Sequence, residues 1–340
     1  IDSSYATGSV TGNSNLGGLI GSNDGTITNS YATGSVTGDN KLGGLCGNNW
    51  YGLIINSYAT GLITGVINLG GLCGHQYGDT ATIVNSFWDT ETSTLLTGYN
   101  LDSSEPGTIT NVVGLQTDLM QTESTFTAAG WDFVDEITNG TFQIWQMPTE
   151  GGYPVLSYLN GYTPAVLSGD GTPSSPYLIS NEVELGATYY YDRNACYKLQ
   201  ADIELSGIQW STAVIPVFGG VFDGNGHTIR NLTIDTAGLN YGYLGLFGKI
   251  DGVSAEVKNL GIENCNIVGG DDSYCLGGLC GGNTNGTITN CYATGSVTAG
   301  NVSDYLGSLC GGNTNGTITK CYATGSVIGG NYIGGLCGGN

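Results

Sequence analysis

Short apolar segments of two to five residues alternate along this chain with turns rich in Gly, Asn, Ser and Thr. Near the amino end the segment TIT is followed by YA, then by a V-T pair, and then by LGGLCG. None of these segments has the 3.6-residue spacing of an amphipathic helix, and β-branched residues bounded by Gly and Asn are typical of short strands. The pattern therefore predicts an all-β chain.

The segments recur at a nearly fixed interval. YATG begins at five places, separated within each block by 26, 27 or 30 residues, namely Tyr5, Tyr31, Tyr58, Tyr292 and Tyr322. GGLCG or a close variant begins at six places, namely Gly17, Gly43, Gly70, Gly277, Gly307 and Gly334. Self-similarity at such a period is the signature of a solenoid.

Aligning the units produces columns of apolar residues. The first column is Ile1, Ile27, Ile54, Ile83, Ile109, Ile229, Val257, Ile288 and Ile318. The second is Leu19, Leu45, Leu72, Leu246, Leu279, Leu309 and Leu336, and the third is Val10, Val36, Ile63, Val297 and Val327. We expect each unit to form one coil of a right-handed parallel β-helix, with about 26 to 30 residues and three short strands per coil. Glycine is expected at corners that need positive φ or a close backbone approach.

The GGLCG and YATGSVTG elements resemble the GLUG-motif repeat of large bacterial surface and secreted proteins, some of them adhesin-like. Residues 165–235, with GDGTPSSPYLISNEVEL and FDGNGHTIRNLTI, resemble the segment that opens such a β-helix. Residues 114–159, with GWDFV and GGYPVL, resemble the segment that closes one. The resemblance implies a structural or adhesive β-helix at the cell surface or outside the cell.

This order of segments predicts parts of two modules. We expect repeats over 1–112, a closing segment over 113–160, an opening segment over 161–235 and further repeats over 236–340. The sequence starts and stops within a repeat, which predicts a longer array, formed by one giant chain or by copies stacked end to end along the helix axis.

Composition restricts the partners. Only 7 Lys and Arg stand against 28 Asp and Glu, for a net charge of −21, so nucleic acid is not an expected partner. Hydrophobic residues make up 39% of the chain, enough for a folded protein, and no apolar run is long enough to predict membrane insertion.

The ten cysteines fall largely into the columns. Cys46, Cys73, Cys280, Cys310 and Cys337 align with Ile20, Phe222 and Phe247, and Cys291 and Cys321 align with Ser4, Ser30, Ser57, Ser86, Leu232 and Leu260. Buried thiols are one interpretation. Disulfides are the other, because Cys280 to Cys291 and Cys310 to Cys321 share an 11-residue spacing, and stacked cysteines of neighbouring coils are also candidates.

No metal or cofactor site is predicted outright. Asp24, Asp271 and Asp272 lie in turns that resemble weak calcium sites, although Asx turns without metal explain them equally well. The two histidines, His75 and His227, lie in different modules, which argues against zinc.

Five Asn-x-Ser/Thr sequons offer glycosylation sites. They are Asn139, Asn231, Asn285, Asn301 and Asn315.

Three functions follow, in this order. The first is a structural part of an extracellular fibre or surface stalk, and the second is an adhesin-like module that presents its Tyr and Thr rows to glycans or a host surface. The third is a polysaccharide-degrading enzyme, which would need a cleft gathering Asp192, Arg193, Asp223, His227 and Arg230. The composition supplies no acid-base constellation, so we expect no catalytic residues and no enzyme.

Overall fold

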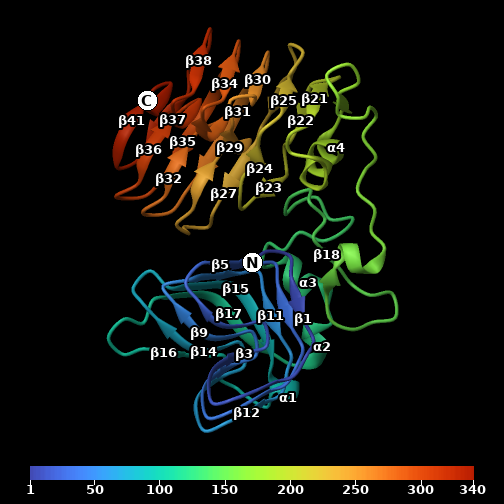
Figure 1. Ribbon diagram of the computed structural model, residues 1–340, viewed down its shortest axis with the longest axis vertical. Coiled ribbons are helices and arrows are strands. Elements are labelled where there is room, and N and C mark those ends of the chain that lie inside the picture. Colours follow the sequence, from blue (N-terminus) through green and yellow to red (C-terminus); the bar gives the residue numbers. More distant parts are fainter. The chain divides into compact units, whose positions relative to one another are not determined.

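The computed structural model describes residues 1–340 and divides them into two compact units. Unit 1 comprises residues 1–134 and 143–162, and unit 2 comprises residues 135–142 and 163–340. Each unit is a stack of parallel coils, about 27 residues apart, which confirms the parallel β-helix (Figure 1).

The coils of unit 1 cross four sheets. The first holds β1 (Tyr5–Ala6), β5 (Thr26–Thr28), β6 (Tyr31–Ala32), β10 (Leu53–Ile55), β11 (Tyr58–Ala59), β15 (Thr82–Asp89) and β17 (Thr108–Leu115). The second holds β2 (Val10–Thr11), β7 (Val36–Thr37) and β12 (Ile63–Thr64), and the third β3 (Ser14–Gly17), β8 (Asn40–Gly43) and β13 (Ile67–Gly70). The fourth holds β4 (Ile20–Asn23), β9 (Cys46–Trp50), β14 (Cys73–Tyr77) and β16 (Tyr99–Leu101).

The coils of unit 2 also cross four sheets. The first holds β20 (Tyr177–Ile179), β21 (Cys196–Leu199), β25 (Val221–Asp223), β30 (Glu256–Lys258), β34 (Thr287–Thr289) and β38 (Thr317–Thr319). The second holds β22 (Ile203–Glu204), β23 (Gln209–Trp210), β26 (Thr228–Arg230), β27 (Thr233–Asp235), β31 (Gly261–Val268), β35 (Tyr292–Thr298), β39 (Tyr322–Ala323) and β40 (Ser326–Ile328). The third holds β24 (Ile215–Phe218), β29 (Phe247–Asp251), β33 (Cys280–Thr284), β37 (Cys310–Thr314) and β42 (Cys337–Gly339). The fourth holds β28 (Gly242–Leu244), β32 (Tyr274–Leu276), β36 (Asp304–Gly307) and β41 (Asn331–Gly334).

Short non-solenoid elements accompany both stacks. Unit 1 adds α1 (Thr90–Ser93), α2 (Thr117–Met120), α3 (Glu123–Thr127), the antiparallel pair β18 (Trp145–Gln146) and β19 (Val155–Leu156), and the 3-10 helix η1 (Ser157–Asn160). Unit 2 adds α4 (Glu182–Ala187) and the 3-10 helix η2 (Thr188–Tyr190).

The expectation of three strands per coil is wrong, because residues in the left-handed region interrupt the backbone and divide each coil into more strands. Residues 26–50, for example, contain the five strands β5 to β9. Asn29 has φ +47° between β5 and β6, and Asn56 has φ +46° at the same corner of the next coil. Asparagine tolerates this region better than other residues with a Cβ, so it can end one strand and start the next in a single residue.

Of the two roles expected for the repeat glycines, positive φ and a close backbone approach, Gly43 and Gly44 have only the second. Gly43 and Gly44 do not have positive φ, but each lies against the backbone of the neighbouring coil. A Cβ on Gly43 would overlap the Cys46 carbonyl oxygen and lie 2.6 Å from the amide nitrogen of Gly74. The close-approach part of the prediction is thus correct, and asparagine is the commonest residue with a Cβ at the left-handed positions.

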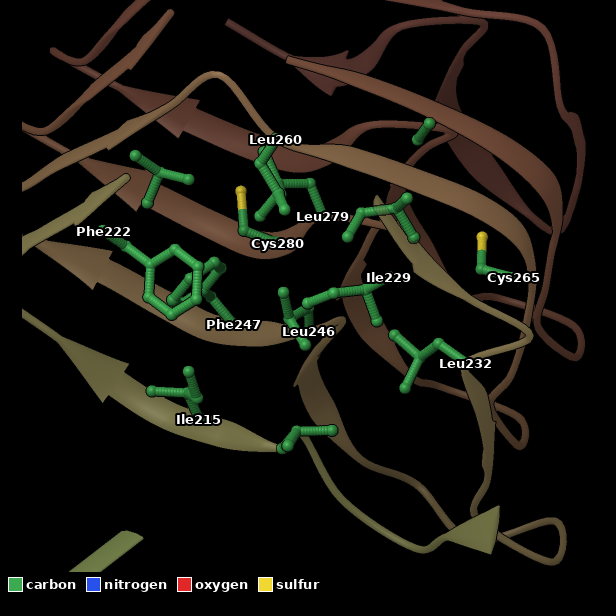
Figure 2. Packing of buried hydrophobic residues seen from close by; sticks show 14 of the residues in the cluster. Ile215, Phe222, Ile229, Leu232, Leu246, Phe247, Leu260, Cys265, Leu279 and Cys280 are labelled. Carbon is green, nitrogen blue, oxygen red and sulfur yellow. The ribbon is translucent and has the colours of Figure 1, made fainter. Parts of the chain in front are cut away.

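The inward columns form the core of each unit. Ile27, Ile54 and Ile83 lie in register and are fully buried, as are Leu45 and Leu72. In unit 2 the larger side chains of Phe222, Phe247 and Leu246 fill the interior beside Cys280 (Figure 2).

The opening coil of unit 2 shifts three residues away from their predicted columns. Phe222 pairs in register with Val257, whereas Ile229 pairs with Ile262. The segment VFD at 221–223 therefore takes the place that the alignment gave to TIR at 228–230. Leu232 and Phe222 accordingly leave the two cysteine columns. The alignment failed here because TIRN matches TITN in letters while the opening segment has different turn lengths.

We predict that Gly43→Ala destabilises unit 1 by about 3 kcal/mol, because an added methyl group must push two coils apart. Gly25→Ala is the matched control, since a Cβ there meets no atom within 4 Å. Urea unfolding of both variants measures the difference. Equal stability of the two variants would contradict the close coil packing at Gly43.

Candidate functional site

Buried asparagines near the carboxyl ends of β4, β9 and β33 form ladders from coil to coil. Asn23 Nδ2 donates to Asn49 Oδ1 at 2.8 Å, and Asn49 Nδ2 donates to Gln76 Oε1 at 2.8 Å. In unit 2, Asn283 donates in the same way to Asn313 at 2.8 Å. These amides bond to one another from coil to coil, so the buried asparagine column has a structural role.

The serine column has a similar pattern. The amide of Ser30 donates to Ser57 Oγ at 3.2 Å, and the amide of Ser57 donates to Ser86 Oγ at 3.2 Å. In unit 2 the amide of Cys291 donates to Cys321 Sγ at 3.4 Å. The thiols of this column therefore replace serine hydroxyls as acceptors.

All ten cysteines are free thiols in the structure. Cys280 lies in register with Cys310, and Cys310 with Cys337, so neighbours in these columns belong to successive coils. Cys46, Cys73, Cys280, Cys291 and Cys310 are buried, and the expected 11-residue pairs do not form disulfides. The hydrogen bond between the side chains of Cys291 and Cys321 lowers the pKa of the Cys321 thiol to about 7. The same bond, together with burial, raises the pKa of the Cys291 thiol.

The tyrosine column is stacked in both units but differs in exposure. Ring centroids lie 5.3 Å apart for Tyr5 and Tyr31 and 5.0 Å apart for Tyr31 and Tyr58. Trp145 packs over both Tyr31 and Tyr58, which are buried. The column of unit 1 therefore anchors the segment after its last coil, and only Tyr5 of its three members is exposed.

In unit 2 the corresponding tyrosine pair is more exposed to solvent. Tyr292 and Tyr322 stack with centroids 4.9 Å apart, and Tyr322 is exposed. The Tyr292 hydroxyl donates to Glu263 Oε1 at 2.6 Å.

A second set of aromatic rings, the outer tyrosine row, runs along one edge of unit 2. Its members are exposed and comprise Tyr243, Tyr274, Tyr305 and Tyr332. Tyr305 and Tyr332 stack with centroids 4.8 Å apart at 7°, and Tyr243 meets Tyr274 edge-on at 5.2 Å. Tyr243, Tyr274 and Tyr305 help to line a groove of about 630 Å³ together with Asp304 and Asn313. The sequence columns missed this row, because Cys275 and Lys41 stand at the same corner of other coils.

Asp89 is a buried carboxylate that sequence reasoning also missed. Its Oδ1 accepts from the amides of Glu91 at 2.8 Å and Thr92 at 3.0 Å at the start of α1. Its Oδ2 accepts from the hydroxyls of Thr117 at 2.7 Å and Tyr153 at 2.6 Å. Asp89 thus connects the end of β15 to the segment that covers the tyrosine column. The only sequence signal was an Asp before the helix-starting residues TETS.

The residues predicted as weak calcium sites belong to different units. Asp24 is exposed, and Asp271, which precedes Asp272, accepts from the amide of Asn301 in the following coil at 2.6 Å. No group of three His, Cys, Asp or Glu side chains in the structure is arranged to hold a metal ion. Calcium binding stays a prediction.

The sequons differ in accessibility. Asn285, Asn301 and Asn315 are exposed, and Asn285 and Asn315 occupy the same left-handed corner in successive coils. Asn231 is half-buried, and its Nδ2 donates to Glu204 at 2.6 Å. Asn139 is half-buried, and its amide donates to Glu136 at 3.1 Å.

The residues proposed for a cleft are only partly brought together. Arg230 lies 3.0 Å from Asp202 and 2.9 Å from Glu263, and His227 lies 3.2 Å from Asp202. Asp223 instead accepts from Asn225 and Asn259, and Asp192 accepts from the amide of Asn194. The charged side chains of this region therefore hold neighbouring coils together on the outer face of unit 2.

Comparison with known families identifies the repeats. The GLUG motif matches residues 12–37, 38–64, 272–298 and 303–328. The chain carries four GLUG motifs. Each copy spans one circuit of the β-helix; the copy at 38–64, for instance, begins before β8 and ends with β12.

Halomucin of Haloquadratum walsbyi is 33% identical to this chain over 220 residues. The match covers 60% of this chain but only 2% of halomucin, so the chain spans a small fraction of that relative. No solved structure gives a significant match. No helix in either GLUG-bearing unit is both long and apolar enough to cross a bilayer.

We predict that Asp89→Asn destabilises unit 1 by about 2 kcal/mol at pH 7, because charge-assisted hydrogen bonds to a buried carboxylate are lost. Burial favours the neutral acid, but the bonds from Tyr153, Thr92, Thr117 and Glu91 outweigh it and lower the pKa below 3.8. A lowered pKa contributes stability above the unfolded value, and this contribution disappears as the pH falls through the folded value.

The measurement is urea unfolding followed by tryptophan fluorescence between pH 7 and pH 3. The decline of stability at acidic pH should be shallower in Asp89→Asn than in the native protein. Asp24→Asn, which removes an exposed carboxylate from the same unit, is the control and should follow the native curve. An unchanged acid slope in Asp89→Asn would contradict the role given to Asp89.

Proposed function

We propose that this chain is a structural segment of an extracellular fibre or surface-attached stalk, in which GLUG coils add length and stiffness. The observation that carries this proposal is the in-register stacking of like side chains in several columns, Ile on Ile, Tyr on Tyr and Asn on Asn. Such ladders resist bending and local opening because each coil is held by its neighbours along the whole circuit.

The similarity to halomucin supports the same proposal. A mucin-like relative that is many times longer than the matched 220 residues fits a role in which repeats build an extended surface structure. The net charge of −21 would keep such rods apart in solution. Copies of this chain that meet end to end would repeat the contact already made between successive coils.

Glycan binding is the second candidate, and the outer tyrosine row favours it. Exposed ring faces beside Asp304 and Asn313 combine apolar stacking surfaces with hydrogen-bonding groups, as sugar-binding grooves require. An adhesin-like module would present this row to a glycan. An enzyme is the weaker alternative, because the charged residues of the outer face are bonded to one another.

We expect electron microscopy of the protein to show rods, with filaments at high concentration and an axial spacing of about 4.8 Å between coils. The mass of the denatured chain, measured in parallel, distinguishes one long chain from stacked copies. Compact single particles at all concentrations would contradict the fibre proposal.

For the glycan-binding candidate, Tyr305→Ala should weaken any binding on a glycan array at least tenfold, because a ring that lines the groove is lost. Tyr322→Ala removes an exposed tyrosine from a different sheet of the same unit and is the matched control. An array without bound glycans, or equal binding by the two variants, would contradict this candidate.

A further inference from the structure

A pocket of about 270 Å³ lies in unit 2, away from the repeats that match the GLUG motif. It is formed by η2, by the segment that leads from η2 into β21, and by β24. Its walls are mainly rings and aliphatic side chains, including Tyr189, Tyr191, Tyr197, Ile215, Val217 and Phe218. Neither the stalk proposal nor the glycan-binding candidate uses this pocket, and the cleft considered for an enzyme shares only Arg193 with its lining.

Three hydroxyl groups of the walls are already bonded within the protein. The Tyr197 hydroxyl donates to the carbonyl of Asp192 at 2.8 Å, and the Tyr191 hydroxyl accepts from the amide of Leu167 at 3.0 Å. The Thr188 hydroxyl donates to the carbonyl of Leu185 at 2.7 Å. The pocket thus offers an apolar surface to a ligand and few groups that could satisfy the hydroxyls of a sugar.

Arg193 supplies the charge at this pocket. The chain has two arginines, and Arg230 is held between Asp202 and Glu263. Arg193 lines the pocket, is exposed, and forms no ion pair in the structure. Lys249, which lies in register with Val217, is already paired with Asp251 at 3.3 Å. The guanidinium of Arg193 is therefore the cation left for a ligand.

Guanidinium and carboxylate groups match in shape, since two parallel N–H donors meet the two carboxylate oxygens. We infer that the pocket binds a small carboxylate with a flat apolar body, of the arylalkanoate class. The ring would lie among the tyrosine and Phe218 side chains and the carboxylate against Arg193. This site is independent of the proposed stalk function, since it lies outside the coils that match the GLUG motif.

The experiment is isothermal titration calorimetry of the full chain with indole-3-acetate as the probe and indole-3-acetamide as its uncharged counterpart. We expect saturable binding of the acid and at least tenfold weaker binding of the amide. Arg193→Gln should weaken the acid at least tenfold, and Arg193→Lys should restore part of the loss. Lys320→Gln removes an equal charge at an exposed site of the last coils and should leave binding unchanged.

A pocket-filling variant separates the pocket from a surface charge effect. Val217→Trp should abolish binding while the far-UV circular dichroism spectrum stays native, because the new ring occupies the space of the ligand. The inference is overturned if the native chain does not bind the acid, or if acid and amide bind equally. It is also overturned if Arg193→Gln or a natively folded Val217→Trp variant binds as the native chain does.

Discussion

Each coil of this chain has to carry, at every position, a side chain that can lie directly on its equivalent in the next coil. Parallel strands joined without a shift of register impose this constraint, because the backbone bonds hold equivalent residues about 5 Å apart. The columns Tyr5, Tyr31 and Tyr58 and Ile27, Ile54 and Ile83 satisfy it with identical residues. The asparagine ladder satisfies it with amides that are donors and acceptors at once.

The same constraint explains which substitutions the columns accept. Cys291 and Cys321 can stand where Ser30 and Ser57 stand in the other unit, because sulfur accepts the same backbone N–H. Where a column changes type, an atom loses its partner. Ile250 precedes Asn283 in its column, and Asn283 Oδ1 is buried without a hydrogen bond. A ladder therefore satisfies the hydrogen-bonding groups of its side chains only where successive coils carry residues of the same type.

The repeat period allowed the parallel β-helix and the inward columns to be predicted from sequence, since letters recur wherever stacking demands it. The prediction failed where letters and space disagree. TIRN at residues 228–231 looks like the TITN element of the repeat but forms the next strand of the coil, because the turns of the opening segment differ in length. The number of strands per coil was also wrong, since a left-handed Asn29 corner leaves no composition signal different from an ordinary turn.

Sites outside the columns were the least predictable. Asp89, the outer tyrosine row and the pocket at Arg193 each depend on residues far apart in sequence, as with Asp89 and Tyr153. The sequence shows two arginines but not which of them is paired. The structure places Arg230 between two carboxylates and leaves Arg193 without an ion pair. The cysteine columns left two arrangements open, partners 11 residues apart within a coil and stacked thiols of neighbouring coils, and the structure places the neighbouring thiols one coil apart.

Cysteine cross-linking across two coils tests the in-register stacking most directly. Ser9 is exposed and Ser35 is half-buried, and their hydroxyls lie 2.9 Å apart. A Ser9→Cys, Ser35→Cys double variant should form an intramolecular disulfide on mild oxidation, as read by mass spectrometry. Ser9→Cys with Thr37→Cys, displaced by two residues along the strand, should stay reduced. Efficient linkage of the displaced pair, or failure of the in-register pair, would contradict the stacking on which the whole account depends.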